Sequence, residues 1–139
     1  MSKHQQTGMH GVYLVAAELA ARGLVVSPTS RSAAGADLLV TDESCANAFS
    51  VQVKTNSKPA GFWLAGVKAR TISSLSHVYV FVNIQAKTGK HDFFVVPSAY
   101  VAQHTKIEVR LKSTWYAFYK KDAETFRDRW SLLTLDNAA

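Results

Sequence analysis

The apolar positions near the start of the chain predict a helix followed by a strand. Residues 9–22 are rich in alanine and leucine, and Gly23 follows as a helix stop. At 100° per residue, one apolar stripe is formed by Val12, Val15, Ala16 and Leu19. Glu18 lies outside this stripe and four residues before Arg22, so we expect a surface ion pair between them. Residues 24–27 continue as a short strand, and residues 28–35 form a loop that leads to Asp37.

The next two apolar runs, residues 38–40 and 49–53, predict an antiparallel hairpin, because the segment between them is polar. Residues directly across such a pair point to the same face. With the turn centred near residues 44 and 45, the register pairs Leu38 with Val51 and Val40 with Phe49. Asp37 then faces Gln52, and Lys54 lies on the same side. One face of the hairpin is therefore apolar, and the other carries an acid, an amide and a base.

The second half of the chain predicts further strands and short helices. Residues 78–84 form an apolar run typical of a buried strand, and a turn at residues 87–90 leads to a second strand at 93–96. Pro97 and Ser98 open a short helix, with Ser98 as its cap or Pro97 as its first residue. The pattern around Trp63 fits either a strand or a helix, and a tryptophan there either packs on the core or stacks on a base.

The last part of the chain predicts a buried strand and a closing helix. Residues 115–119 are aromatic or alanine, which indicates a strand buried on both faces. Helical spacing then relates Phe126, Trp130 and Leu133, so we expect a helix that begins near Asp122. Together these elements predict an α/β fold with one mixed central sheet flanked by helices, formed as a single domain over residues 1–139.

The composition bears on disulfides, metal sites and cellular location. The single cysteine, Cys45, excludes an internal disulfide framework and the usual thiolate zinc sites. The sequence has neither an apolar signal core nor an apolar run long enough to span a bilayer, so we expect no membrane partner and a cytoplasmic location. The oligomeric state stays open, a homodimer included.

Charge is spread unevenly along the chain. Lys and Arg against Asp and Glu number three and four in residues 1–53, eleven and two in 54–121, and two and four in 122–139, which gives −1, +9 and −2 and recovers the net +6. A basic middle segment favours a polyanionic partner, nucleic acid first, although the same charge also serves solubility.

The polar face of the hairpin is the candidate site. The oxygens of Asp37 and Gln52 suit a hard cation such as Mg²⁺, and the ammonium of Lys54 suits a water or a phosphate oxygen beside it. The same pattern also fits an ordinary hairpin in which Asp37 and Lys54 form a solvated ion pair. The sequence has no G-x-S-x-G element, P-loop or dinucleotide fingerprint, and its five histidines show no metal-ligand spacing.

In this order of elements, G-x-D-L-L-V at residues 35–40 and V-Q-V-K-T at 51–55 resemble the PD-(D/E)xK nuclease superfamily, which includes restriction-endonuclease-like and Holliday-junction-resolvase-like enzymes. A G-x-x-G before the first helix and an L-x-x-x-G at its end add to the resemblance. It implies a restriction-endonuclease-like core in which Asp37 is the metal-binding aspartate, Gln52 replaces the usual glutamate and Lys54 is the lysine. The carbonyl of Val53 is then a further ligand of Mg²⁺ or Mn²⁺.

The resemblance also exposes two departures. Many active members carry a glutamate early in the first helix, where this chain has Val12, and His10 and Tyr13 are the polar residues nearest that position. Gln52 removes a second negative charge. Two functions therefore follow as hypotheses. One is a metal-dependent endonuclease that cleaves DNA and grips its backbone through Lys58, Lys68 and Arg70; the other is an inactive nuclease-fold module that binds nucleic acid or a protein.

Overall fold

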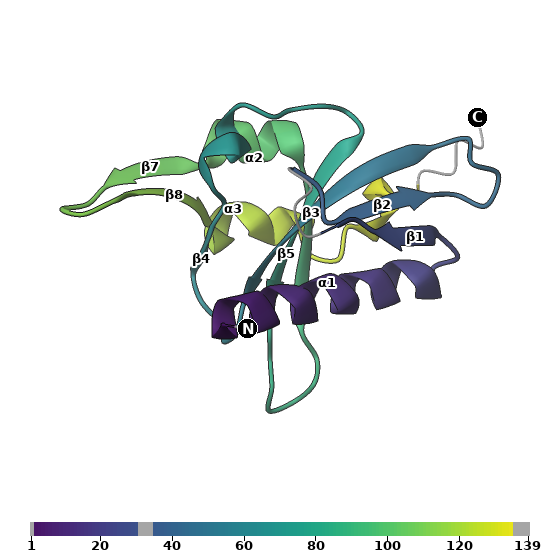
Figure 1. The fold of residues 1–139 in the computed structure, drawn as a ribbon, viewed down its shortest axis with the longest axis horizontal. Coiled ribbons are helices and arrows are strands. Elements are labelled where there is room, and N and C mark those ends of the chain that lie inside the picture. Colours follow the sequence, from purple (N-terminus) through teal and green to yellow (C-terminus); the bar gives the residue numbers. More distant parts are fainter. Residues whose placement is uncertain (1, 31–34, 135–139) are drawn as a thin grey trace.

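The computed structural model describes residues 2–30 and 35–134, so part of the predicted loop before Asp37, residues 31–34, lies outside the described residues. At its centre is a five-stranded mixed sheet of order β1-β2-β3-β5-β6 (Figure 1). Its strands are β1 (Val25–Pro28), β2 (Leu38–Thr41), β3 (Ala48–Asn56), β5 (His77–Asn83) and β6 (Asp92–Pro97). Only the β3–β5 pair is parallel, and the other neighbours are antiparallel. The predicted mixed α/β sheet is thus confirmed.

Helix α1 (Lys3–Ala21) covers one face of this sheet. It begins six residues earlier than the sequence pattern indicated, because Ser2 and Gln5 form a capping box at its start. Both glycines of the G-x-x-G segment therefore lie inside the helix rather than before it. Between the helix and the sheet lies an apolar core built from Val15 and Leu19 of α1 and the valines, leucine and phenylalanine on the matching face of β2, β3, β5 and β6.

The opposite face of the sheet is covered by segments that follow β3, whereas Trp130 and Leu133 near the end of the chain pack in the core on the α1 side. This layer contains β4 (Phe62–Leu64), the 3₁₀ turn η1 (Val67–Arg70), α2 (Ser98–His104), β7 (Lys106–Val109), β8 (Thr114–Tyr119) and α3 (Lys120–Ala123). β4, β8 and β7 form a second, three-stranded sheet. Trp63 of β4 is buried against Phe81 and Phe94 and donates a hydrogen bond from Nε1 to the Val82 carbonyl at 2.9 Å. It is therefore a core residue and not an exposed stacking platform.

Three sequence predictions for the last third of the chain are wrong in part. The closing helix is broken into α3 and two 3₁₀ turns, Glu124–Phe126 and Trp130–Leu132, because Asp128 adopts φ 54° and donates its N–H to the Phe93 carbonyl on the edge of β6. β8 is buried only at Ala117 and Phe118, since its first half extends beyond the body of the protein. Pro97 is the N-cap of α2 and Ser98 its first residue, so neither predicted capping arrangement holds.

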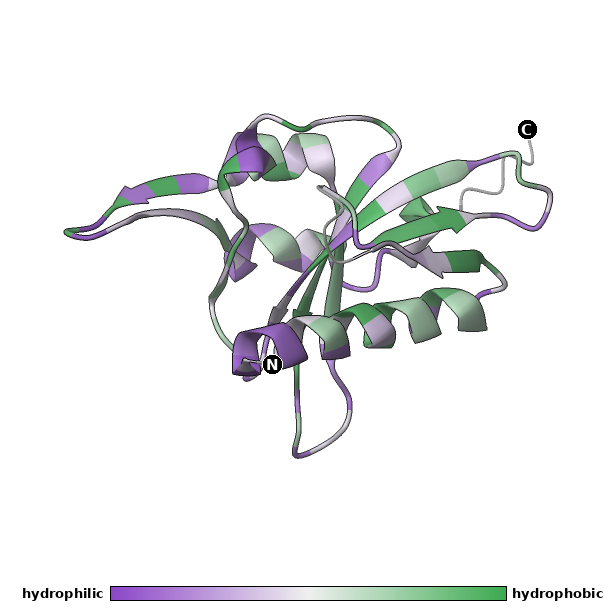
Figure 2. Cartoon of the chain, in the orientation of Figure 1, coloured by the Kyte–Doolittle hydropathy of each residue, from purple (hydrophilic) through white to green (hydrophobic). Residues whose placement is uncertain are grey.

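Hydropathy follows these layers. Figure 2 shows hydrophobic colours along the central strands and along the middle of α1, and hydrophilic colours at the start of α1 and in the loops. No helix among the described residues is long and apolar enough to cross a membrane. The expected surface pair is present, with Arg22 Nη1 at 3.3 Å from Glu18 Oε1.

Candidate functional site

The predicted hairpin register is confirmed, with Leu38 opposite Val51 and Val40 opposite Phe49. β3 is longer than β2, so its second half, residues 52–56, has β5 on one side and no strand partner on the other among the described residues. Asp37 directly precedes β2 and lies at the point where this open edge begins. The carboxylate therefore occupies the place where another strand would otherwise donate and accept main-chain hydrogen bonds.

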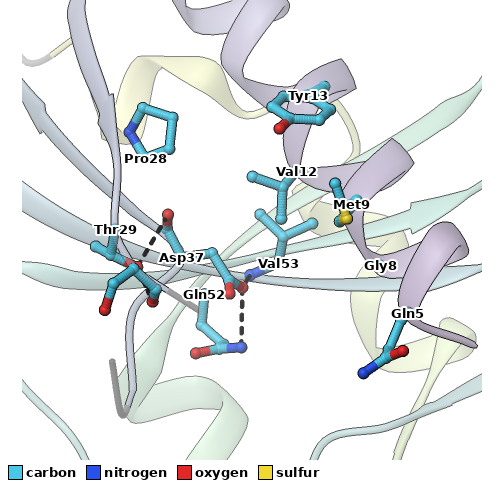
Figure 3. Close-up of a pocket in the computed structure, with 11 residues that line it drawn as sticks. Gln5, Gly8, Met9, Val12, Tyr13, Pro28, Thr29, Asp37, Gln52 and Val53 are labelled. Carbon is cyan, nitrogen blue, oxygen red and sulfur yellow. Dashed lines mark hydrogen bonds between the residues drawn. The ribbon is translucent and has the colours of Figure 1, made fainter. Parts of the chain in front are cut away.

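Three hydrogen bonds to β3 fix Asp37 at this edge, two of them drawn in Figure 3. Its main-chain N–H donates to the Val51 carbonyl at 2.8 Å, and its Oδ2 accepts from the Val53 N–H at 2.8 Å and from Gln52 Nε2 at 3.0 Å. Behind it, Thr29 Oγ1 donates to the Ala36 carbonyl at 2.7 Å and so holds the chain just before the aspartate. Oδ1 of Asp37 has no hydrogen-bond partner in the described part of the chain.

The same bonds orient two further oxygen atoms. Gln52 uses its amide nitrogen toward Asp37, which leaves its Oε1 available as an acceptor. In a strand, the N–H and C=O of one residue point to the same edge, so the Val53 carbonyl lies on the side where its N–H meets Asp37. The open edge of β3 therefore gathers a carboxylate, an amide oxygen and a peptide carbonyl.

Burial and neighbouring charge have opposite effects on the pKa values of Asp37 and Lys54. Burial raises the pKa of Asp37, and the Val53 N–H and the nearby Lys54 ammonium only partly offset it. Burial likewise lowers the pKa of Lys54, against the attraction of Asp37. No ion pair within 4.0 Å joins these two residues in the described structure, so the solvated cross-strand pair that the sequence also allowed does not form. Both residues line one cavity.

Two cavities meet at Asp37 and Gln52. The first, of about 380 Å³, lies between the sheet edge and α1 and is lined by Gln5, Gly8, Met9, Val12, Tyr13, Pro28, Thr29, Ser30, Asp37, Gln52 and Val53. The second, of about 420 Å³, lies on the side of η1 and is lined by Gly35, Asp37, Gln52, Lys54, Ala65, Gly66, Val67, Lys68, Ile72 and Tyr79. The acid and the amide thus form the wall between a largely apolar cavity and a basic one.

The first cavity shows what the helix contributes. Val12 faces Asp37 and Val53 across it, and Tyr13 also lines it (Figure 3). His10 instead contacts the ring of His91, with ring centroids 6.1 Å apart, and does not line this cavity. Glu18 is held by Arg22 and lines neither cavity. No carboxylate of α1 therefore reaches the site, and Val12 occupies the position that the resemblance assigns to an acid.

Of the three residues predicted to bind the DNA backbone, one lines the second cavity. Lys68 of η1 lines it beside Lys54, whereas Lys58 and Arg70 are exposed outside it. Tyr79 of β5 also lines it, directly opposite Gln52 in the parallel register, and was missed from the sequence. Period two along residues 77–83 was the available signal, because it places Tyr79 on the face opposite to Val78 and Val80.

These groups make a sparse metal site. Among the described residues there is no cluster of three or more His, Cys, Asp or Glu side chains that could hold a metal ion. Asp37 Oδ1, Gln52 Oε1 and the Val53 carbonyl are nevertheless all hard oxygen donors, the kind that Mg²⁺ and Mn²⁺ prefer, and Mg²⁺ commonly keeps several waters. The donor set fits a divalent ion that is bound by one negative charge and completed by water or phosphate.

Comparison with known proteins places the fold. No protein-family model matches the sequence, and no curated protein is significantly similar to it. The structure is similar to that of the bacterial homing endonuclease I-Ssp6803I, with a TM-score of 0.66 and 15% identity over 99% of this chain and 96% of that one. Hjc, a Holliday junction resolvase from the archaeal hyperthermophile Archaeoglobus fulgidus, matches with a TM-score of 0.48 and 10% identity over 85% and 88% of the two chains. The chain therefore has the restriction-endonuclease-like nuclease fold.

Proposed function

We propose that this protein is a metal-dependent endonuclease that hydrolyses phosphodiester bonds in DNA. The observation that carries the proposal is the convergence of Asp37, Gln52 and Lys54 on one cavity at the open edge of β3. Three polar groups of these types are costly to desolvate together, and perturbed titratable groups in a cavity are typical of functional sites. The fold is one that a homing endonuclease also uses.

Each residue has a separate part in the proposed reaction. Asp37, Gln52 and the Val53 carbonyl hold Mg²⁺ or Mn²⁺, which when bound supplies an activated water and neutralises charge on the scissile phosphate. The Lys54 ammonium binds a phosphate oxygen and stabilises the negative charge that grows on it during in-line attack. A water oxygen bonds to phosphorus as that water gives one proton to solvent, the bridging P–O bond breaks, and the leaving oxygen takes a proton from solvent.

Basic residues around the second cavity support a nucleic-acid substrate. Lys68 adds a second ammonium beside Lys54, and neither has an acidic partner within 4.0 Å among the described residues. Lys58 and Arg70, both exposed in the connection between β3 and β5, add further positive charge. Such contacts bind phosphate without reading sequence.

The test is cleavage of supercoiled plasmid with Mg²⁺ or Mn²⁺. Wild-type protein should nick the plasmid, and D37A and K54A should abolish the reaction, because they remove the site's carboxylate and its ammonium. Glu43→Ala is the matched control, since Glu43 is an exposed acid in the β2–β3 loop outside both cavities. Equal background cleavage by all four proteins would contradict the proposal.

A second candidate is a nuclease-fold module that binds DNA without cutting it. Val12 and Gln52 favour it, because they leave Asp37 as the single carboxylate among the described residues that line the two cavities. Such a module should bind DNA with a strong salt dependence, and added Mg²⁺ should act on it only as a competing cation, equally in wild type and D37A. Calorimetry separates the two functions: Mn²⁺ binding that D37A removes supports the endonuclease, and no measurable binding supports the module.

A further inference from the structure

The hairpin of β7 and β8 forms an arm, residues 106–119, that projects from the body of the protein (Figure 1). Its outer part is held by its own ladder, which pairs Lys106–Val109 with residues 114–117, and by a bond from the Arg110 N–H to the Ser113 carbonyl at 2.8 Å. At its tip, Val109 is 81% exposed and Leu111 is fully exposed. Large apolar side chains in this position have no partner in the described structure.

The arm is stiffened along one face. The guanidinium of Arg110 lies 4.2 Å from the centre of the Trp115 ring and 2.9 Å from a carboxylate oxygen of Glu108. Tyr119 donates its hydroxyl hydrogen to the other oxygen of Glu108, and Phe62 of β4 stacks on Trp115. A free two-stranded hairpin is only marginally stable in water, so these contacts keep the arm in one shape before any partner binds.

The arm is also basic. It contains Lys106, Arg110 and Lys112 against one acid, Glu108, a balance of +2, and Lys120 and Lys121 follow directly in α3. Glu108 is already paired with Arg110, and Lys120 with Glu124. This leaves Lys106, Lys112 and Lys121 without an acidic partner among the described residues. The charge is therefore directed outward.

Side chains alternate along β7 in a way that suits a groove. Figure 2 shows hydrophilic and hydrophobic colours in turn along this strand, because Lys106 and Glu108 lie on one face and Ile107 and Val109 on the other. A two-stranded ribbon fits the major groove of B-DNA, where basic side chains reach the phosphates and apolar side chains contact base edges.

We propose that the arm inserts into the major groove of duplex DNA and anchors the duplex to the protein. This inference rests on the proposed function in one respect, because DNA is the ligand in both. Binding by the arm requires neither a metal ion nor cleavage. A second copy of the chain is the poorer partner, because two arms with a charge of +2 repel each other and the apolar face offers only Ile107, Val109 and Leu111.

The test uses charge removal at two matched places. Lys106→Ala combined with Lys112→Ala removes two unpaired lysines from the arm, and Lys87→Ala combined with Lys90→Ala removes two exposed lysines from the β5–β6 turn. Binding to a 30-base-pair duplex is measured by fluorescence anisotropy in EDTA over a range of salt concentrations. The arm variant should reduce the slope of log K against log salt by about 1.8 and weaken binding at 100 mM salt by roughly tenfold to a hundredfold. The control variant should bind like the wild type.

Several outcomes overturn the proposal. Equal losses of DNA affinity in the two double variants indicate general electrostatic attraction and not contact by the arm. Tighter binding to the single strand than to the duplex excludes groove insertion, and so does unchanged duplex binding by Leu111→Ser. A dimer in sedimentation that Leu111→Ser dissociates identifies the arm as a protein interface. The binding assay in EDTA is independent of metal-dependent cleavage. If the arm variants lose binding and the plasmid assay fails, the arm is a DNA-binding element and the endonuclease proposal is rejected.

Discussion

Gly11 sets the distance between α1 and the strand that carries the candidate site. A Cβ atom built on Gly11 would lie 1.7 Å from Thr55 Oγ1, 2.8 Å from Thr55 Cβ and 2.9 Å from Thr55 Cγ2. Rotation of the threonine side chain moves Oγ1 but not Cβ, so relief requires the helix to move away from β3. Gly8 lies one helical turn earlier, and a Cβ atom there would meet nothing within 4 Å. The two glycines therefore form a matched pair.

Substitution of each glycine by alanine should change stability in opposite directions. Alanine in a helix interior gains about 0.5–1 kcal/mol over glycine, so Gly8→Ala should stabilise the protein by about that amount. Gly11→Ala gains the same term but adds overpacking, which costs about 1–3 kcal/mol. A clash with the Cβ of a β-branched residue belongs near the upper end of that range. The net loss should be about 2 kcal/mol, and the two variants should differ by about 3 kcal/mol.

Urea denaturation at pH 7 measures both free energies of unfolding. Thr55→Ala in the Gly11→Ala background removes Oγ1 and Cγ2, so it should restore part of the loss and give a favourable coupling between the two sites. If Gly11→Ala unfolds at the same urea concentration as Gly8→Ala, the close approach of α1 to β3 is not what glycine provides at this position.

Three further predictions concern the site and the core. Burial raises the pKa of Asp37, so linkage makes the folded protein less stable as pH rises through that pKa. Asp37→Asn should therefore be more stable than wild type at pH 7 and equal to it below the unfolded pKa of about 3.9. Urea titrations across pH check this prediction, and a less stable variant at pH 7 contradicts it. Val12→Glu adds a carboxylate facing Asp37 and should tighten Mn²⁺ binding by about tenfold or more in calorimetry, whereas Val12→Gln, the uncharged control, should not. Trp63→Phe removes the 2.9 Å hydrogen bond to Val82 and should cost about 2 kcal/mol of unfolding free energy; a loss below about 0.5 kcal/mol refutes that role.

Local signals predicted the hairpin correctly. The pairing of Leu38 with Val51 follows from period two and a polar turn, both of which are properties of adjacent residues. The start of α1 was also readable, since Ser2 and Gln5 have capping-box spacing. Two glycines drew the predicted start inward, but glycine costs a helix only about 1 kcal/mol and tertiary contact exceeds that at Gly11.

Contacts between residues far apart in the sequence determine the features of the fold and site that were not predicted. Phe126 and Trp130 have helical spacing, yet the chain between them leaves the helix because Asp128 bonds to β6 and Arg127 pairs with Asp92 at 2.7 Å. The approach of Lys68 to Lys54 has the same origin. It depends on the crossover between β3 and β5 and on the pairing of β4 with β8, far along the chain. No periodicity in residues 62–70 encodes that distance.

The self-contained ladder of the β7–β8 arm has an evolutionary consequence. Its outer pairs contribute nothing to either apolar core, so two residues can be added to or removed from each strand without disturbing the sheet that holds Asp37. Steps of two preserve which side chains share a face, whereas steps of one exchange the faces. Natural variation can therefore alter the reach of this hairpin independently of the chemistry and stability of the rest of the molecule.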